Sequence, residues 1–175
     1  SDIYISYITD RVKLGDKKLK VVFDCGNATT GPFIKDIISN FNIEPIYLFD
    51  EVDPTFPNHH PDPAVEDNMR FLKEKVKEVN ADLGIGYDGD GDRLGVVNNL
   101  GEYVKTDLIM SLLAKQVVLE NDNKNILYDI KCSKVIEDTV LSVGGTPHLY
   151  RTGASYTRYK TVLEKYSFGG ELSGH

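Results

Sequence analysis

Short apolar runs alternate with helix-type segments along the whole chain, and this alternation limits the fold more than any other feature. Each apolar run has the length of a buried strand, and in the following stretch apolar residues recur every three or four positions. The strand-type runs are 21–24, 46–49, 83–87, 94–97, 126–130 and 146–151. Strands that alternate with helices are typical of α/β folds with largely parallel sheets.

Four helices are predicted between these strands. The first begins at Gly31-Pro32, where proline is tolerated in the first turn. The expected inward faces of the first two are Ile34, Ile37, Ile38 and Phe41, and Val65, Met69, Leu72, Val76 and Val79. The other two extend from Thr106 or Asp107, as possible caps, to about Leu119, and from a Ser133 cap to the Gly144-Gly145 stop.

A fifth helix is expected from Ser155 to Tyr166, with Tyr159, Val162, Leu163 and Tyr166 facing inward. The segment 2–12 fits helix and strand equally well. Four prolines exclude a helix or central strand in the loop 53–63. The βα pattern restarts near residue 104, which predicts two α/β units, 1–104 and 105–175, the second of them incomplete.

Charge and composition exclude several functions. The net charge of −7 argues against a nucleic-acid or anionic-membrane binder, because both partners attract basic surfaces. No apolar run approaches the roughly 18–20 residues of a membrane helix, and the N-terminus lacks a signal-peptide pattern. Cys25 and Cys132 are far apart and are expected to be free thiols in a reducing compartment, which predicts a cytoplasmic protein.

The strongest chemical signal is the loop Asp88-Gly89-Asp90-Gly91-Asp92-Arg93. Glycines between the carboxylates let the backbone bend sharply, so the three acidic groups can converge on one point. Converging carboxylates repel one another unless a cation lies between them, and such oxygen ligands suit Mg²⁺, Mn²⁺ or Ca²⁺. The adjacent Arg93 can bind a phosphate, as phosphoryl transfer requires.

Two other functions fit the same loop. A strand that ends in Asp88-Gly89-Asp90 is also similar to aspartate-nucleophile phosphatases, although those have a different pair of residues after the second aspartate. The alternative activity is therefore a metal-dependent phosphatase with Asp88 as nucleophile. A non-enzymatic metal-binding fragment is the other alternative.

Six segments of the chain resemble the α-D-phosphohexomutase superfamily, and most closely its bacterial phosphomannomutase/phosphoglucomutase branch. They occur in that family's order and cover nearly the whole sequence: Asp24–Asn27, Phe56–Pro63, Asp88–Arg93, Tyr128–Ser133, Arg151–Gly153 and Gly170–His175. The resemblance implies two three-layer αβα units with mixed, largely parallel sheets. Residues 1–104 would correspond to the family's second domain and 105–175 to a truncated third domain.

The resemblance also implies an activity and a set of site residues. The full-length parent would be an Mg²⁺-dependent enzyme that interconverts hexose 1-phosphates and 6-phosphates of mannose and glucose, through a phosphoserine and a bisphosphate intermediate. The phosphoserine domain and the domain that holds the distal phosphate would lie in the missing N- and C-terminal parts of the same chain, so the isolated fragment is expected to be inactive. The implied metal ligands are Asp88, Asp90 and Asp92, the catalytic residues Arg93 and Lys131, and the sugar-binding residues Glu171, Ser173 and His175.

The sequence carries expectations for four further residues: His59, His60, His148 and Ala154. Adjacent histidines point apart in an extended chain, so His59 and His60 are expected to anchor their loop rather than bind metal. His148 is expected to be structural. Ala154 departs from the family pattern, which commonly has histidine after Thr-Gly. Because alanine cannot carry a proton, either another group transfers it, the residue was altered, or proton transfer is impaired.

Overall fold

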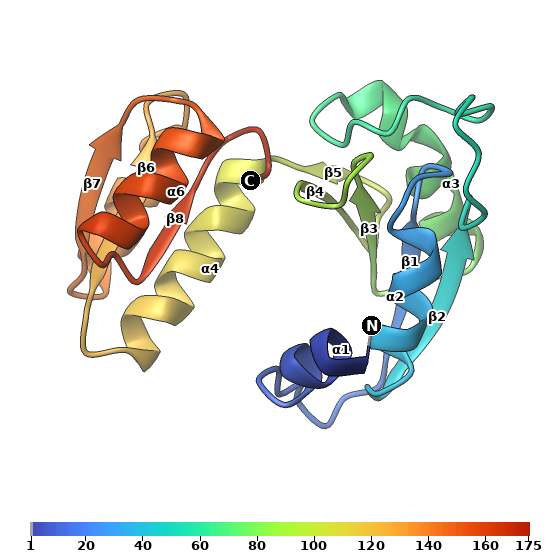
Figure 1. Ribbon diagram of the computed structural model, residues 1–175, viewed down its shortest axis with the longest axis horizontal. Helices are drawn as coiled ribbons and strands as arrows, with labels where there is room; N and C mark the ends of the chain where they lie inside the picture. The colour runs from blue at the N-terminus through green and yellow to red at the C-terminus, as the bar shows by residue number, and fades with distance from the viewer. Residues whose placement is uncertain (1) are drawn as a thin grey trace. The chain divides into compact units, whose positions relative to one another are not determined.

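The computed structural model describes residues 2–175 and divides into two compact units, one ending at Tyr103 and the other Val104–His175. None of the helices in residues 2–175 is long and apolar enough to cross a bilayer. Figure 1 shows that each unit is a sheet with helices packed on it.

The sheet of the first unit has five strands in the order β2-β1-β3-β4-β5. Its strands are β1 (Leu19–Asp24), β2 (Ile43–Leu48), β3 (Leu83–Tyr87), β4 (Leu94–Asn98) and β5 (Tyr103–Val104). The central strand β1 is parallel to β2 and β3, whereas β4 returns antiparallel to β3. The acidic loop 88–93 is therefore the turn of a hairpin.

Helices cover both faces of this sheet, as Figure 1 shows for α2 and α3. The helical elements are α1 (Asp2–Thr9), α2 (Gly31–Ile38), the 3₁₀ helix η1 (Glu66–Met69) and α3 (Arg70–Glu78). Side chains alternate along β1, so Phe23 packs with Ile34 of α2 and Val22 packs with Leu72 of α3. Burial of each such side chain contributes roughly 1.5–3 kcal/mol to folding.

Glycines in β3 allow α3 to pack closely. A Cβ placed on Gly84 would lie 2.7 Å from side-chain carbons of both Leu72 and Val76. The Gly-x-Gly pattern in this strand therefore serves helix packing, since any larger residue would push α3 off the sheet.

The second unit has three parallel strands in the order β7-β6-β8. Its elements are α4 (Thr106–Glu120), β6 (Asn125–Asp129), α5 (Val135–Ser142), β7 (Thr146–Tyr150), α6 (Ala154–Leu163) and β8 (Phe168–Gly170). Helices α4 and α5 form one core with Ile126 and Tyr128 of β6. In β8, Gly169 packs against Thr161 of α6 and Gly170 against Met110 of α4, so these two helices lie on opposite faces.

The two units share one plan, because β7-β6-β8 repeats the order and direction of β2-β1-β3. This architecture confirms the predicted α/β fold with mixed and largely parallel sheets. The strands at 21–24, 83–87 and 126–130 were located within about two residues, the usual uncertainty of element ends. The segment 2–12, for which the sequence left two alternatives, begins with helix α1.

The predicted inward face of α6 is wrong. Tyr159, Val162 and Leu163 are 69%, 74% and 62% exposed, while Thr157 is buried. The reason lies in β8, where glycine brings the helix so close that Thr161 fits and a larger side chain does not. Tyr166 lies beyond the end of α6 and is half-buried beside His148.

Two predicted helix faces extend too far. Phe41 lies after the end of α2, and Val65 precedes η1 and is exposed. Each position continues the apolar spacing of its helix, but turn residues end or delay the helical conformation there.

The predicted side-chain caps are also wrong. Neither α4 nor α5 has a side-chain hydrogen bond at its N-terminus, and the cap positions are Lys105 and Lys134. The Asp107 carboxylate instead accepts a hydrogen bond from the Ser133 backbone N–H at 3.1 Å. This bond joins the start of α4 to the loop after β6, a tertiary contact that capping rules do not include.

Candidate active-site loops

The three aspartates of the acidic loop converge. One carboxylate oxygen each from Asp88, Asp90 and Asp92 lies within 4.8 Å of the other two. Asp88 is buried, whereas Asp90 and Asp92 are exposed. Gly91 has a φ of +76°, a left-handed conformation that glycine adopts without strain and that turns the loop back toward β4. Three hard oxygen donors within this span fit a divalent cation such as Mg²⁺.

Arg93 holds the carboxylate of Asp88, the buried aspartate of the three, in place. Its Nε donates to Asp88 Oδ2 at 2.8 Å, and its backbone N–H donates to Asp88 Oδ1 at 3.1 Å. Its Nη1 donates to Asp62 Oδ1, also at 2.8 Å. Burial acts to raise the pKa of Asp88, but the bonds to Arg93 outweigh it and lower that pKa. The guanidinium predicted to bind phosphate thus holds two carboxylates in this structure.

The proline-rich loop is anchored by His59, as predicted. His59 Nε2 lies 3.1 Å from both carboxylate oxygens of Asp24, and Nδ1 lies 2.9 Å from the His60 carbonyl. A carbonyl and a carboxylate only accept hydrogen bonds, so both contacts are hydrogen bonds only when both ring nitrogens are protonated, as in the imidazolium. Phe71 stacks on it, and Phe49 meets it edge-on. The proline-rich loop is therefore joined to β1 by the contact of His59 with Asp24, and to the acidic loop by the bond between Asp62 and Arg93.

This ion pair predicts a pH dependence of stability. Burial acts to lower the pKa of His59, but Asp24 and the His60 carbonyl outweigh it and raise that pKa above the unfolded value of 6.5. The stabilisation is therefore complete below pH 6.5 and is lost as pH rises through the folded-state pKa. For each unit by which the folded-state pKa of His59 exceeds the unfolded value, we expect the free energy of unfolding of the first unit to fall by about 1.4 kcal/mol.

Urea unfolding between pH 5.5 and 9 would measure this loss, with the variant His59→Gln as control. Glutamine does not titrate, so the variant should lack the decline. The same decline in both proteins would show that His59 is not its source.

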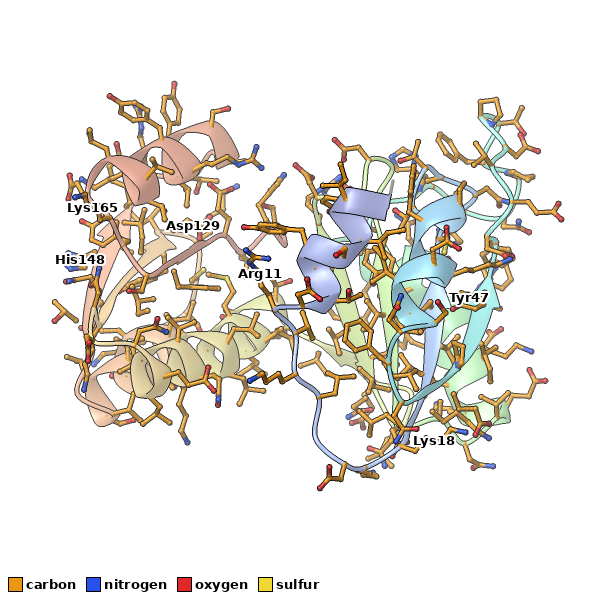
Figure 2. The ribbon with its side chains drawn as sticks, turned by 60° about the horizontal axis from the view of Figure 1, so that its bottom comes forward. Arg11, Lys18, Tyr47, Asp129, His148 and Lys165 are labelled. Carbon is orange, nitrogen blue, oxygen red and sulfur yellow. The ribbon has the colours of Figure 1, made fainter. Side chains whose placement is uncertain are left out.

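A second buried aspartate organises the loops of the second unit. Asp129 ends β6, as Asp24 ends β1, and each accepts the backbone N–H two residues later, at 3.2 Å from Lys131 and 3.0 Å from Gly26. Asp129 Oδ2 also accepts a hydrogen bond from the Thr152 hydroxyl at 3.1 Å. The Lys131 side chain is exposed beside this junction. Figure 2 shows Asp129 apart from His148, which lies on the edge strand β7 and contacts Asn125 and Tyr166 in a structural role.

Glu171 is the most deeply buried of the predicted site residues, at 2% exposure. Its Oε1 accepts hydrogen bonds from the Gly153 N–H at 2.8 Å and the Thr157 hydroxyl at 2.6 Å. Ser173 Oγ lies 3.3 Å from Glu171 Oε2 and 2.9 Å from His175 Nδ1. The structure thus brings Glu171, Ser173 and His175 together, and Glu171 ties them to the Gly153-Ala154 start of α6.

The cysteines are free thiols in both units. Burial raises the pKa of Cys25 to about 12. Cys132 donates its thiol proton to Asp129 Oδ1 at 3.0 Å, and burial together with this carboxylate raises the pKa of Cys132 further. Both thiols are therefore protonated and unreactive near neutral pH.

Sequence reasoning missed four residues that hold these loops: Thr29, Asp62, Asp129 and Thr152. Asp62, Asp129 and Thr152 lie inside segments that carried the family resemblance, which was the available signal. Thr29 lies just after such a segment, and its role depends on a contact with a residue 60 positions away.

Two family models cover nearly all of the chain. Residues 2–101 match "Phosphoglucomutase/phosphomannomutase, alpha/beta/alpha domain II", and residues 105–175 match domain III of the same family. The chain therefore belongs to the phosphoglucomutase/phosphomannomutase family.

Individual relatives point to one branch of this family. The chain is 41% identical over 174 residues to a phosphomannomutase/phosphoglucomutase of Pseudomonas syringae, covering 99% of this chain and 37% of the relative. It is 33% identical over 175 residues to a phosphoglucomutase of Neisseria gonorrhoeae, covering all of this chain and 38% of the relative. A crystal structure of a family member from Burkholderia thailandensis superposes with a TM-score of 0.95 at 37% identity, covering 99% of this chain and 38% of that one. The chain thus spans little more than a third of the length of these relatives.

Proposed function

We propose that this chain supplies the second and third domains of a phosphohexomutase that interconverts hexose 1-phosphates and 6-phosphates of mannose and glucose. The remaining domains of the same protein would supply the phosphoserine and the residues that bind the distal phosphate. The convergence of Asp88, Asp90 and Asp92 within 4.8 Å is the observation that carries the proposal. Free thiols in both units agree with a cytoplasmic location.

The acidic loop would hold Mg²⁺, with Asp88, Asp90 and Asp92 as protein ligands. The bound ion would supply positive charge that stabilises the transferring phosphoryl group. The oxygen atoms of Asp88 are directed by Arg93, whose guanidinium is charged at every accessible pH. Arg93 itself is a candidate contact for phosphate, which would take the place of the Asp62 carboxylate on Nη1.

The second unit would bind the sugar. Glu171 and Ser173 offer a carboxylate and a hydroxyl, which suit paired sugar hydroxyls. Their mutual contacts hold them in one orientation before substrate arrives, which reduces the ordering required on binding. Lys131 is exposed, so its side chain can contact the phosphoryl group, and it is also our candidate for general base, a role that only the neutral amine can perform. His175 adjoins Ser173 and would face the same substrate.

A chimera tests the proposal. This chain would replace the matching region of the Pseudomonas aeruginosa relative, which is 41% identical over 172 residues. We expect the chimera to interconvert glucose 1-phosphate and glucose 6-phosphate in a coupled assay, and the isolated chain to show no turnover. A folded chimera that releases inorganic phosphate from either sugar without isomerising it would instead support the phosphatase alternative. A folded chimera without any activity would also contradict the proposal.

A further inference from the structure

Thr29, from another part of the first unit, is hydrogen-bonded to the acidic loop. Thr29 lies between β1 and α2, and its hydroxyl donates to the Gly89 carbonyl at 2.9 Å. The Thr29 backbone N–H lies 3.4 Å from the same oxygen. This carbonyl belongs to the peptide that joins Gly89 to Asp90. Both donors of one residue thus restrain the peptide between two of the converging carboxylates.

The neighbouring threonine contacts the other glycine of the loop. A Cβ placed on Gly91 would lie 2.9 Å from Thr30 Oγ1, so the loop passes directly beside this hydroxyl. Each glycine of the acidic loop therefore contacts one residue of the pair Thr29-Thr30. The glycines that allow the loop to bend also leave it without conformational restraint of its own, and this pair supplies restraint from outside.

The Thr29 hydroxyl has no role in capping its own helix. The cap position of α2 is Thr30, and no side-chain hydrogen bond is made there. Thr29 is itself exposed and lies outside the hydrophobic core, so its side chain adds little to packing. The bond to Gly89 is the contact through which this hydroxyl acts in the first unit.

We infer that Thr29 is a positioning residue for the metal ligands. Arg93 directs Asp88 from one side of the loop, and Thr29 fixes the peptide that precedes Asp90 from the other. Together they hold the first two carboxylates at a separation suited to one cation. This inference rests on the proposed metal site, in which Asp90 is a ligand. Groups that orient metal ligands typically contribute 10- to 100-fold in metal affinity.

Metal binding by three variants tests this role. Mn²⁺ would be titrated into the 175-residue chain and followed by the electron paramagnetic resonance of the free ion. Thr29→Val removes the hydroxyl at nearly constant volume and should weaken Mn²⁺ binding about tenfold. Thr29→Ser keeps the hydroxyl and should restore most of the affinity. Thr146→Val removes a threonine hydroxyl on the exposed start of β7 and should leave affinity unchanged.

Different results would contradict the metal site and the role of Thr29. No Mn²⁺ binding by the parent chain would contradict the metal site itself. Binding by the parent that is equally tight in Thr29→Val, or equally weak in Thr29→Val and Thr29→Ser, would overturn the role of the Thr29 hydroxyl alone. Thermal unfolding of each variant would show whether a loss of affinity reflects a loss of fold.

Discussion

Replacing Glu171 with alanine is expected to destabilise the second unit by about 3 kcal/mol, because a buried charged acceptor would be removed from its donors. The Gly153 N–H and the Thr157 hydroxyl would lose the carboxylate oxygen that accepts both of their hydrogen bonds. Thr157 is buried, so water could replace that oxygen only by entering the space that Glu171 vacates. The start of α6 and the loop 171–175 would lose their connection.

Hydrogen exchange of the β6 amides would measure this effect, because it reports the opening of the second unit separately from the first. Glu164→Ala is the matched control, since Glu164 is exposed and its carboxylate bonds to Lys160 and Tyr166, both near it in the chain. That control should change stability by about 0.5 kcal/mol or less. Similar exchange rates in the two variants would mean that Glu171 does not hold the unit together.

The conservative variant Glu171→Gln separates the structural role from sugar binding. Glutamine retains an oxygen for Gly153 and Thr157, so the fold of the second unit should survive. The other carboxylate oxygen becomes an amide, which changes the group offered to a sugar hydroxyl. In the chimera we therefore expect turnover to fall while exchange protection remains; an unchanged kcat/KM would reject Glu171 as a sugar contact.

The strands were predictable because their apolar runs are short, continuous and bounded by turn residues. The same logic failed for α6, whose sequence offers Tyr159, Val162 and Leu163 as an inward face. Periodicity identifies an apolar stripe but contains no information about which neighbour the helix meets. Here the glycines of β8 set that contact, and Thr161 fills it.

The candidate site was likewise predictable only in part. The Asp-Gly alternation of residues 88–92 predicted the convergence of three carboxylates from local geometry alone. What holds those carboxylates was not predictable, since Asp62 and Thr29 reach the loop through contacts between residues 31 and 60 positions apart. Arg93 illustrates the limit well: its position beside the aspartates indicated phosphate binding, whereas its bonds in the structure are to Asp88 and Asp62.

We expect Asp88, Asp90 and Asp92 to bind one divalent cation. Changing Asp90→Asn removes a unit of charge at nearly constant volume, and two charges about 4 Å apart near a protein surface interact by about 4 kcal/mol. Asp90 is exposed, so part of this interaction is screened by solvent. We expect a loss of affinity of about 100-fold, which corresponds to about 2.8 kcal/mol.

Titration calorimetry of the chain with Mn²⁺ and Mg²⁺ would measure this affinity. The parent should bind one ion weakly, because the proposed phosphoserine ligand lies in another domain. Asp122→Asn removes the same charge from an exposed turn of the second unit and should bind as the parent does. Asp90→Asn should lose about 100-fold in affinity relative to both; equal affinity in all three proteins would show that the three aspartates do not form the site.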